Sequence, residues 1–179
     1  MPKADNAIAQ LASLLEGSAA KPVIVESRLA PSAIYDVEYR TVVVALVFEK
    51  FAKRFGTAGD RRILSAKLKL LQFVAFRPWL LPAIEEWSEA EEQGSLAITR
   101  SMRIRRGFLS DTAHEDVINL LVACGVLVRS KGHLVTGPKA GELTKISKAA
   151  IEQGLFSDVQ DALLELEGIT FTSSMLEGW

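Results

Sequence analysis

Few side chains in this chain of 179 residues are of the kinds that catalyse reactions or bind metal ions. His114 and His133 are the only histidines and Cys124 is the only cysteine, and none of them has a second ligand at metal-binding spacing. Cys124 falls on the predicted core face of a helix, which favours a buried structural thiol over a nucleophile. No G-x-x-x-x-G-K-[ST] phosphate loop and no G-x-G-x-x-G turn occurs. The residues therefore predict a protein that is not an enzyme and that holds no metal or cofactor.

Two clusters of charge are the other candidates for function. Five glutamates lie between residues 85 and 92, and a basic cluster follows: Arg100, Arg103, Arg105 and Arg106. They are either solvated charges, some paired with each other, or a bipolar surface whose arginines face an acidic partner or phosphates. The net charge is −1 and the isoelectric point is near 6.2, which argues against an autonomous DNA-binding module.

The composition also indicates where the protein works. A single cysteine cannot form an internal disulfide, which is typical of a reducing, cytoplasmic compartment. The longest apolar run, Val42 to Phe48, is far shorter than the roughly 20 residues that cross a bilayer. We therefore expect a soluble cytoplasmic protein with no membrane partner.

The residue patterns around these side chains predict a mainly α fold with a small β-hairpin. In this fold a helical core is joined to a winged-helix element. Four segments are expected: residues 1–30 as an N-terminal helix and linker, 31–98 as the helical core, 99–155 as the winged-helix region, and 156–179 as a C-terminal helix with an apolar docking tail.

The helical core contains one ambiguous stretch. Residues 42–48 are β-branched and could form a buried strand, but their apolar face continues at helical spacing to Phe55 before Gly56 interrupts it. We therefore predict one long buried helix over 32–55. Asp60 is expected to cap the next helix, which Arg77-Pro78 ends, and a further helix follows through Trp87.

The winged-helix region rests on several local signals. Thr112 and Glu115 match a capping box, and Gly125 stands where a helix is expected to end. Residues 126–128 and 134–135 predict two strands joined by a turn from Arg129 to His133. Pro138 then begins another helix.

The charges on this region do not suit a recognition helix. Its exposed positions are predicted to include His114, Glu115, Asp116 and Asn119, with Asp111 just before them, and carboxylates repel phosphates. Arg129 and Lys131 on the wing could contact a DNA backbone, but only weakly and without specificity. We therefore interpret the element as a platform for protein docking, with Glu115 and Asp116 as contacts.

The C-terminal segment has an apolar character of its own. Ser157 is expected to cap a short helix, and the last residues include Phe171, Met175, Leu176 and Trp179. This tail either packs on the core of its own chain or docks on a partner, since aromatic residues and methionine are enriched at interfaces.

Four stretches together are similar to a known family. They are LKLLQFVAFRP (68–78), RSMRIRRGFLSD (100–111), DVINLLVACGVLVRSKGHLVTGPKAGEL (116–143) and FSDVQDALLELEGITFTSSMLEGW (156–179). In order, length and texture the chain resembles, from Ile34 onward, the middle component of three-component ABC-ATPase systems such as the Lamassu-type anti-phage operons.

The resemblance implies a non-catalytic adaptor that binds an SMC-like ATPase and holds an effector subunit, often a nuclease. It implies no catalytic residues. The alternative from the residues is a winged-helix transcriptional regulator that contacts DNA through the arginine cluster and the wing.

Overall fold

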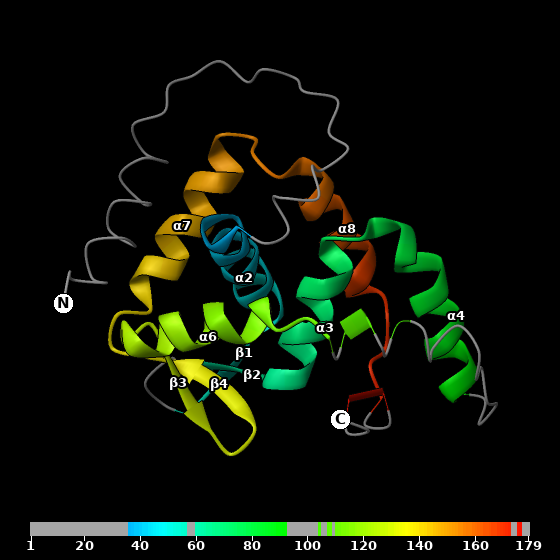
Figure 1. Cartoon of the computed structure of the whole chain (residues 1–179), viewed down its shortest axis with the longest axis horizontal. Helices are drawn as coiled ribbons and strands as arrows, with labels where there is room; N and C mark the ends of the chain where they lie inside the picture. The colour runs from blue at the N-terminus through cyan, green and yellow to red at the C-terminus, as the bar shows by residue number, and fades with distance from the viewer. Residues whose placement is uncertain are drawn as a thin grey trace.

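The computed structural model describes residues 36–56, 60–92, 104, 107–108, 110–172 and 175–176. Within these ranges the fold is mainly α with a small β element, as predicted. The helices are α2 (Val37–Phe51), α3 (Ser65–Ala75), α4 (Leu81–Glu92), α6 (Ala113–Ala123), α7 (Gly141–Glu152) and α8 (Ser157–Glu167), with a 3-10 turn η2 (Pro78–Leu80). The strands are β1 (Lys53–Phe55), β2 (Asp60–Leu64), β3 (Leu127–Ser130) and β4 (His133–Thr136). Helix α2 packs against α3, α6, α7 and α8 (Figure 1).

Helix α2 begins at a side-chain cap and is buried over its middle. Asp36 Oδ1 accepts hydrogen bonds from the N–H groups of Glu38 (2.8 Å) and Tyr39 (3.0 Å). Residues 42–48 are all buried, and contact with four other helices outweighs the strand preference of their valines. The predicted helix is confirmed from Val37 to Phe51, with Asp36 as its extended N-cap, and residues 32–35 lie outside the described residues. Its last residues are not helical, because 53–55 form β1.

The helix predicted to start at Asp60 begins later. Residues 60–64 form β2, which pairs with β1 on one side and with β4 on the other, and α3 starts only at Ser65. The predicted cap at Asp60 is therefore wrong. The predicted break at Arg77-Pro78 is confirmed, since α3 ends at Phe76 and Pro78 opens η2.

The four strands form one antiparallel sheet in the order β1-β2-β4-β3. The predicted hairpin is present, and its turn is shorter than expected: Lys131 and Gly132 alone connect the strands, with φ of 44° and 79°. Two successive positive φ angles are the signature of a type I′ turn. Because β4 also pairs with β2, the hairpin is part of a larger sheet rather than a separate wing. The winged-helix assignment itself stays a prediction.

The junctions around α6 and α7 combine one confirmed signal with two wrong ones, one of which is the start of α7: it begins at Gly141, and the predicted first residue, Pro138, lies in a turn. Gly125 ends α6 with φ of +74°, as predicted. The capping box is absent, because the Thr112 side chain makes no cap hydrogen bond. Gly137 packs directly on this corner: its N–H donates to the carbonyl of Val126 (2.9 Å), and a Cβ there would lie 2.4 Å from the carbonyl oxygen of Gly125.

The C-terminal residues fold back onto the rest of the chain. Phe156, with φ of 60°, precedes α8, so the predicted Ser157 cap is wrong and Ser157 is the first residue of the helix. Met175 and Leu176 are buried in the common core, which corresponds to the self-packing alternative for the tail. Trp179 and the N-terminal helix and linker predicted over residues 1–30 lie outside the described residues.

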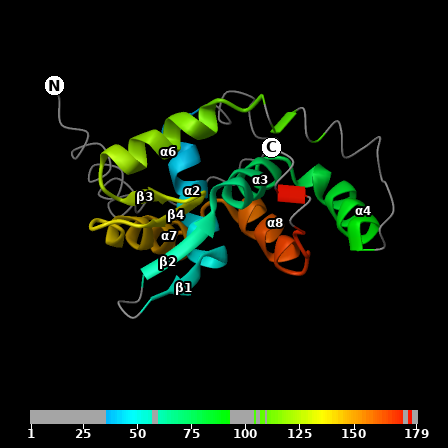
Figure 2. The same ribbon diagram turned by 90° about the horizontal axis from the view of Figure 1, so that it is seen from below.

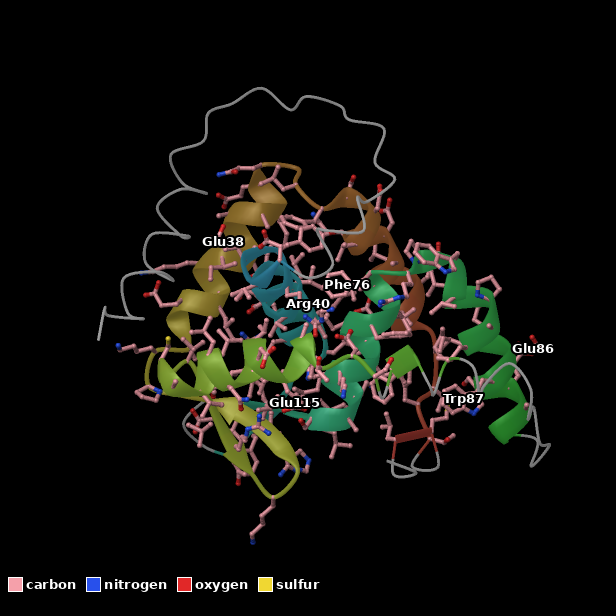
Figure 3. The ribbon with its side chains drawn as sticks, viewed as in Figure 1. Glu38, Arg40, Phe76, Glu86, Trp87 and Glu115 are labelled. Atoms are coloured by element: carbon pink, nitrogen blue, oxygen red, sulfur yellow. The ribbon has the colours of Figure 1, made fainter. Side chains whose placement is uncertain are left out.

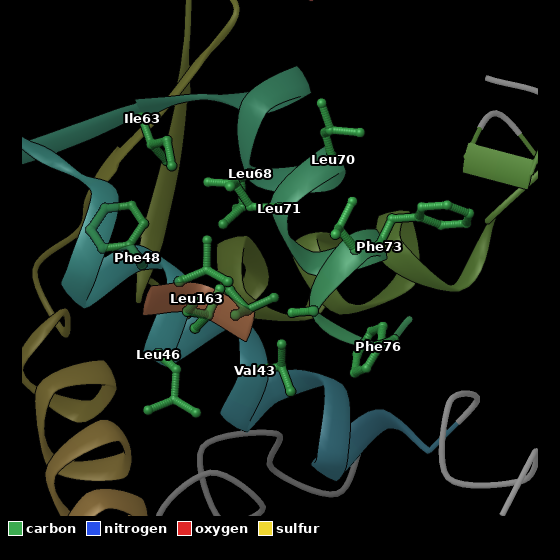
Figure 4. Packing of buried hydrophobic residues seen from close by; sticks show 14 of the residues in the cluster. Val43, Leu46, Phe48, Ile63, Leu68, Leu70, Leu71, Phe73, Phe76 and Leu163 are labelled. Carbon is green, nitrogen blue, oxygen red and sulfur yellow. The ribbon is translucent and has the colours of Figure 1, made fainter. Parts of the chain in front are cut away.

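A single hydrophobic cluster connects these elements. Figure 4 shows side chains of α2, α3 and α8 meeting in it, with Ile63 of β2 close by. Because β2 pairs with β4 and α2 packs on α7, the predicted segments 31–98 and 99–155 share one sheet and one core. Among the residues that the structure describes, no helix combines the length and apolar character needed to span a membrane.

Candidate docking surfaces

A buried ion pair holds the start of α6 against α2. Arg40 is 1% exposed and its Nη2 lies 2.9 Å from the carboxylate of Asp111, whose side chain is 7% exposed. The guanidinium also lies 4.9 Å from the centre of the Phe76 ring, and Figure 3 shows these two side chains between α2 and α3. Asp111 was predicted to repel phosphates at the surface. That prediction is wrong, because its charge is turned inward and neutralised.

His114 extends this polar cluster and is buried, not exposed as predicted. Gln72 donates its amide N–H to the carbonyl of Arg40 (3.3 Å), so its Oε1 is the acceptor that faces His114 Nδ1. This assigns the neutral Nδ1–H form, and Nε2 is buried without a hydrogen-bond partner among the described residues. Burial lowers the pKa of His114 to about 4, so the ring is neutral at physiological pH.

Glu115 and the hairpin are joined by a second pair at the surface. Arg129 Nη2 donates to Glu115 Oε2 (2.9 Å) and to Asn119 Oδ1 (2.8 Å). Partial burial on its own would raise the pKa of Glu115, but the Arg129 hydrogen bond and nearby positive charges outweigh it, and the pKa is lowered. Two of the three carboxylates expected at the front of this helix, Asp111 and Glu115, are thus neutralised within the chain. Asp116 remains exposed.

The four-stranded sheet is strongly basic, which the sequence analysis missed. Its strands and the turn between β3 and β4 carry one carboxylate, Asp60, and six cations: Lys53, Arg54, Arg61, Arg62, Arg129 and Lys131. We call this element the basic sheet. Arg61 pairs with Glu49, and the hydrogen bond it donates lowers the pKa of that carboxyl. The other cations of β1 and β2, together with Lys131, are exposed and form no ion pair within the part of the chain that the structure describes.

Helices α4 and α8 pack together and form a surface of the opposite sign. Neither helix contains a lysine or arginine, and their exposed carboxylates are Glu85, Glu86, Glu89, Asp158, Asp161, Glu165 and Glu167. We call this the acidic surface. A cleft of about 260 Å³ between the helices is lined by Glu85, Glu89 and Glu165. Helix α4 lies on the side of the molecule away from the basic sheet (Figures 1 and 2), and Figure 3 shows Glu86 at its outer edge.

The remaining predicted site residues have different fates. Arg100, Arg103, Arg105 and Arg106 lie outside the described residues, and so does Trp179. Phe171 is half-buried with its ring 4.9 Å from Lys67 Nζ. Met175 and Leu176 are not available to a partner, because they are buried. Cys124 is buried, as predicted. Among the described residues no group of three or more histidine, cysteine or carboxylate side chains could hold a metal ion.

Comparison with protein-family models, curated proteins and solved structures found no match to this chain.

Proposed function

We propose that this chain is a non-catalytic adaptor that holds two partners at once, one at the basic sheet and one at the acidic surface. The observation that carries the proposal is the separation of charge: a chain of net charge −1 gathers six cations on one element and seven exposed carboxylates on two adjacent helices. Surfaces of opposite sign attract different partners and disfavour exchange between them.

The resemblance noted in the sequence suggests what the partners are. An SMC-like ATPase and an effector subunit of a bacterial anti-phage system would each occupy one of the two surfaces. Such an adaptor would contribute affinity and geometry to the complex and would leave the chemistry to its partners.

Co-expression with the products of the neighbouring genes tests the adaptor. A tagged chain should bring down an SMC-like ATPase and a second subunit, and the complex should weaken as salt rises, since contacts between exposed charges are screened. A chain that elutes alone, as a monomer, in the presence of those products would contradict the proposal.

A DNA-binding regulator is the second candidate, and one observation favours it. Asp111 and Glu115 no longer oppose phosphates, because Arg40 and Arg129 neutralise them. Asp116→Lys removes the carboxylate that stays exposed at this end of α6. A regulator should then bind duplex DNA more tightly in a gel-shift assay, whereas an adaptor should show no change.

A further inference from the structure

The strand register defines which residues of the basic sheet face away from the core. Ile63 and Leu134 are paired across β2 and β4 and are both buried, so they mark the inner face. Side chains alternate along a strand, and their neighbours therefore form the outer face. The outer-face residues are Lys53, Phe55, Asp60, Arg62, Leu64, Val128, Ser130, His133 and Val135, and Asp60 is the one carboxylate among them.

This outer face is open. Phe55 is 43% exposed, Leu64 41% and Val128 45%, and these three side chains come from three different strands. Phe55 and Val128 lie on the two edge strands and Leu64 on a strand between them, so apolar area is accessible to a partner across the width of this face.

On this face the Arg62 guanidinium lies over the Phe55 ring, and we call these two stacked groups the platform. The Arg62 guanidinium carbon lies 4.5 Å from the centre of the Phe55 ring, and Lys53 is directly opposite Arg62 in the register. Aromatic rings and guanidinium planes are the groups on which unpaired nucleic-acid bases stack.

The charge around the platform suits a phosphate chain. Arg61 and Arg129 are engaged with Glu49 and Glu115, but Lys53, Arg62 and Lys131 are exposed. Lys67 nearby has a lowered pKa, first because it is partly buried and then because Lys53 adds a like charge. The cations here outnumber the carboxylates, and a polyanion would relieve their repulsion.

We propose that the outer face of the basic sheet binds single-stranded nucleic acid, with a base stacked on the Phe55–Arg62 platform and phosphates at Lys53, Arg62 and Lys131. The inference goes beyond the proposed function: a strand on the outer face would compete with a protein partner of the basic sheet for Lys53, Arg62 and Lys131. In a duplex the bases are stacked on each other, so none is available to stack on the platform. An acidic peptide carries the negative charge but no base to stack there. Both are weaker occupants of this face.

Fluorescence anisotropy of the full chain with a labelled 15-nucleotide dT or rU strand tests the proposal. We expect micromolar binding at 50 mM salt and a slope of log K against log salt of about −2, for three phosphates neutralised on a single strand. Duplex DNA of equal length should bind more weakly, and polyglutamate should compete poorly. No binding at 50 mM salt, equal affinity for duplex, or equal competition by polyglutamate would overturn it.

Variants separate stacking from charge. Phe55→Leu should weaken binding about tenfold at constant salt slope, because one base–ring stack is lost. Arg62→Lys keeps the charge and loses the planar group, so it should fall between Phe55→Leu and wild type. Lys145→Gln, at an exposed position of α7 away from the sheet strands, is the matched control and should bind as the wild type does. A Phe55→Leu variant that is folded by circular dichroism and binds like wild type would contradict the platform. Since only the chain and an oligonucleotide are needed, this result is independent of the co-purification test.

Discussion

Buried polar contacts connect α2, α3 and the start of α6. They are made by Arg40, Gln72, Asp111 and His114. Burying a charge is costly, and the attraction of its partner offsets that cost only while the pair is intact. These four residues therefore fix where α6 starts relative to α2 more than they add net stability. Their positions also explain why the front of α6 is less acidic than its sequence suggests.

Removal of the Asp111 charge should destabilise the folded chain strongly. Asp111→Asn deprives the buried Arg40 of its carboxylate, and we expect the free energy of unfolding to fall by about 3 kcal/mol in urea titrations. The matched control is Lys145→Gln, which breaks the exposed pair with Glu142 and should cost under about 1 kcal/mol. Equal losses in the two variants would refute the role assigned to the buried pair.

His114 should make stability depend on pH. Its folded-state pKa of about 4 lies below the ordinary 6.5, so between these values the unfolded chain binds a proton that the folded chain does not. The stabilisation is complete above pH 6.5 and is lost as the pH falls toward 4, by ~2 kcal/mol between pH 7 and pH 5.

Urea titrations at pH 7 and pH 5 measure this loss. His114→Gln should abolish most of the difference between the two pH values, whatever its own stability. His133→Gln, on the hairpin, should keep the wild-type difference. The interpretation fails if His114→Gln retains it.

At the scale of elements, the corner between β4 and α7 is the tightest backbone approach among the described glycines. A Cβ at Gly137 would lie 2.4 Å from the carbonyl oxygen of Gly125. Both are backbone positions, so the clash could be relieved only by a shift of the backbone. Gly137→Ala should therefore lower the melting temperature and cost about 2 kcal/mol.

Gly141 offers the matched substitution for Gly137. It is the first residue of α7, and a Cβ there meets nothing within 4 Å. Gly141→Ala should be neutral or slightly stabilising, because alanine favours a helix over glycine. If both variants melt at the same temperature, the close approach at Gly137 does not matter.

The elements that could be predicted from the sequence are those with local signals. The hairpin from 127 to 136 has its glycine-containing turn beside it, and the end of α6 has Gly125. Strands β1 and β2 were missed because β2 pairs with β4, some 70 residues away, and their short segments KRF and DRRIL show no apolar alternation.

The candidate surfaces were predicted unevenly for the same reason. The glutamates of α4 are close together in the sequence and predict an acidic cluster directly. Lys53 and Arg62 are nine residues apart and become neighbours only when β1 and β2 pair. Asp111 and His114 looked exposed because their partners, Arg40 and Gln72, lie on α2 and α3, far from them in the sequence. The net charge of −1 gives no indication that the positive and negative side chains lie on separate surfaces.

At the scale of the whole molecule, the basic sheet and α4 lie at opposite sides of one shared core (Figure 2). Such an arrangement lets two partners bind without touching each other. Because both proposed contacts are between charged surfaces, raising the salt concentration from 0.1 to 0.5 M should release both partners in a pull-down, while the chain stays folded by circular dichroism. Retention of both at high salt would point to apolar contacts instead.

The most direct test of the two-surface adaptor compares three tagged forms co-expressed with the neighbouring gene products. They are the wild type, an acidic-surface variant (Glu85→Lys, Glu86→Lys, Glu89→Lys) and a basic-sheet variant (Lys53→Gln, Arg62→Gln, Lys131→Gln). We predict that the wild type brings down two components and that each variant loses a different one and keeps the other. Variants that both keep both components, or both lose the same one, would contradict the account.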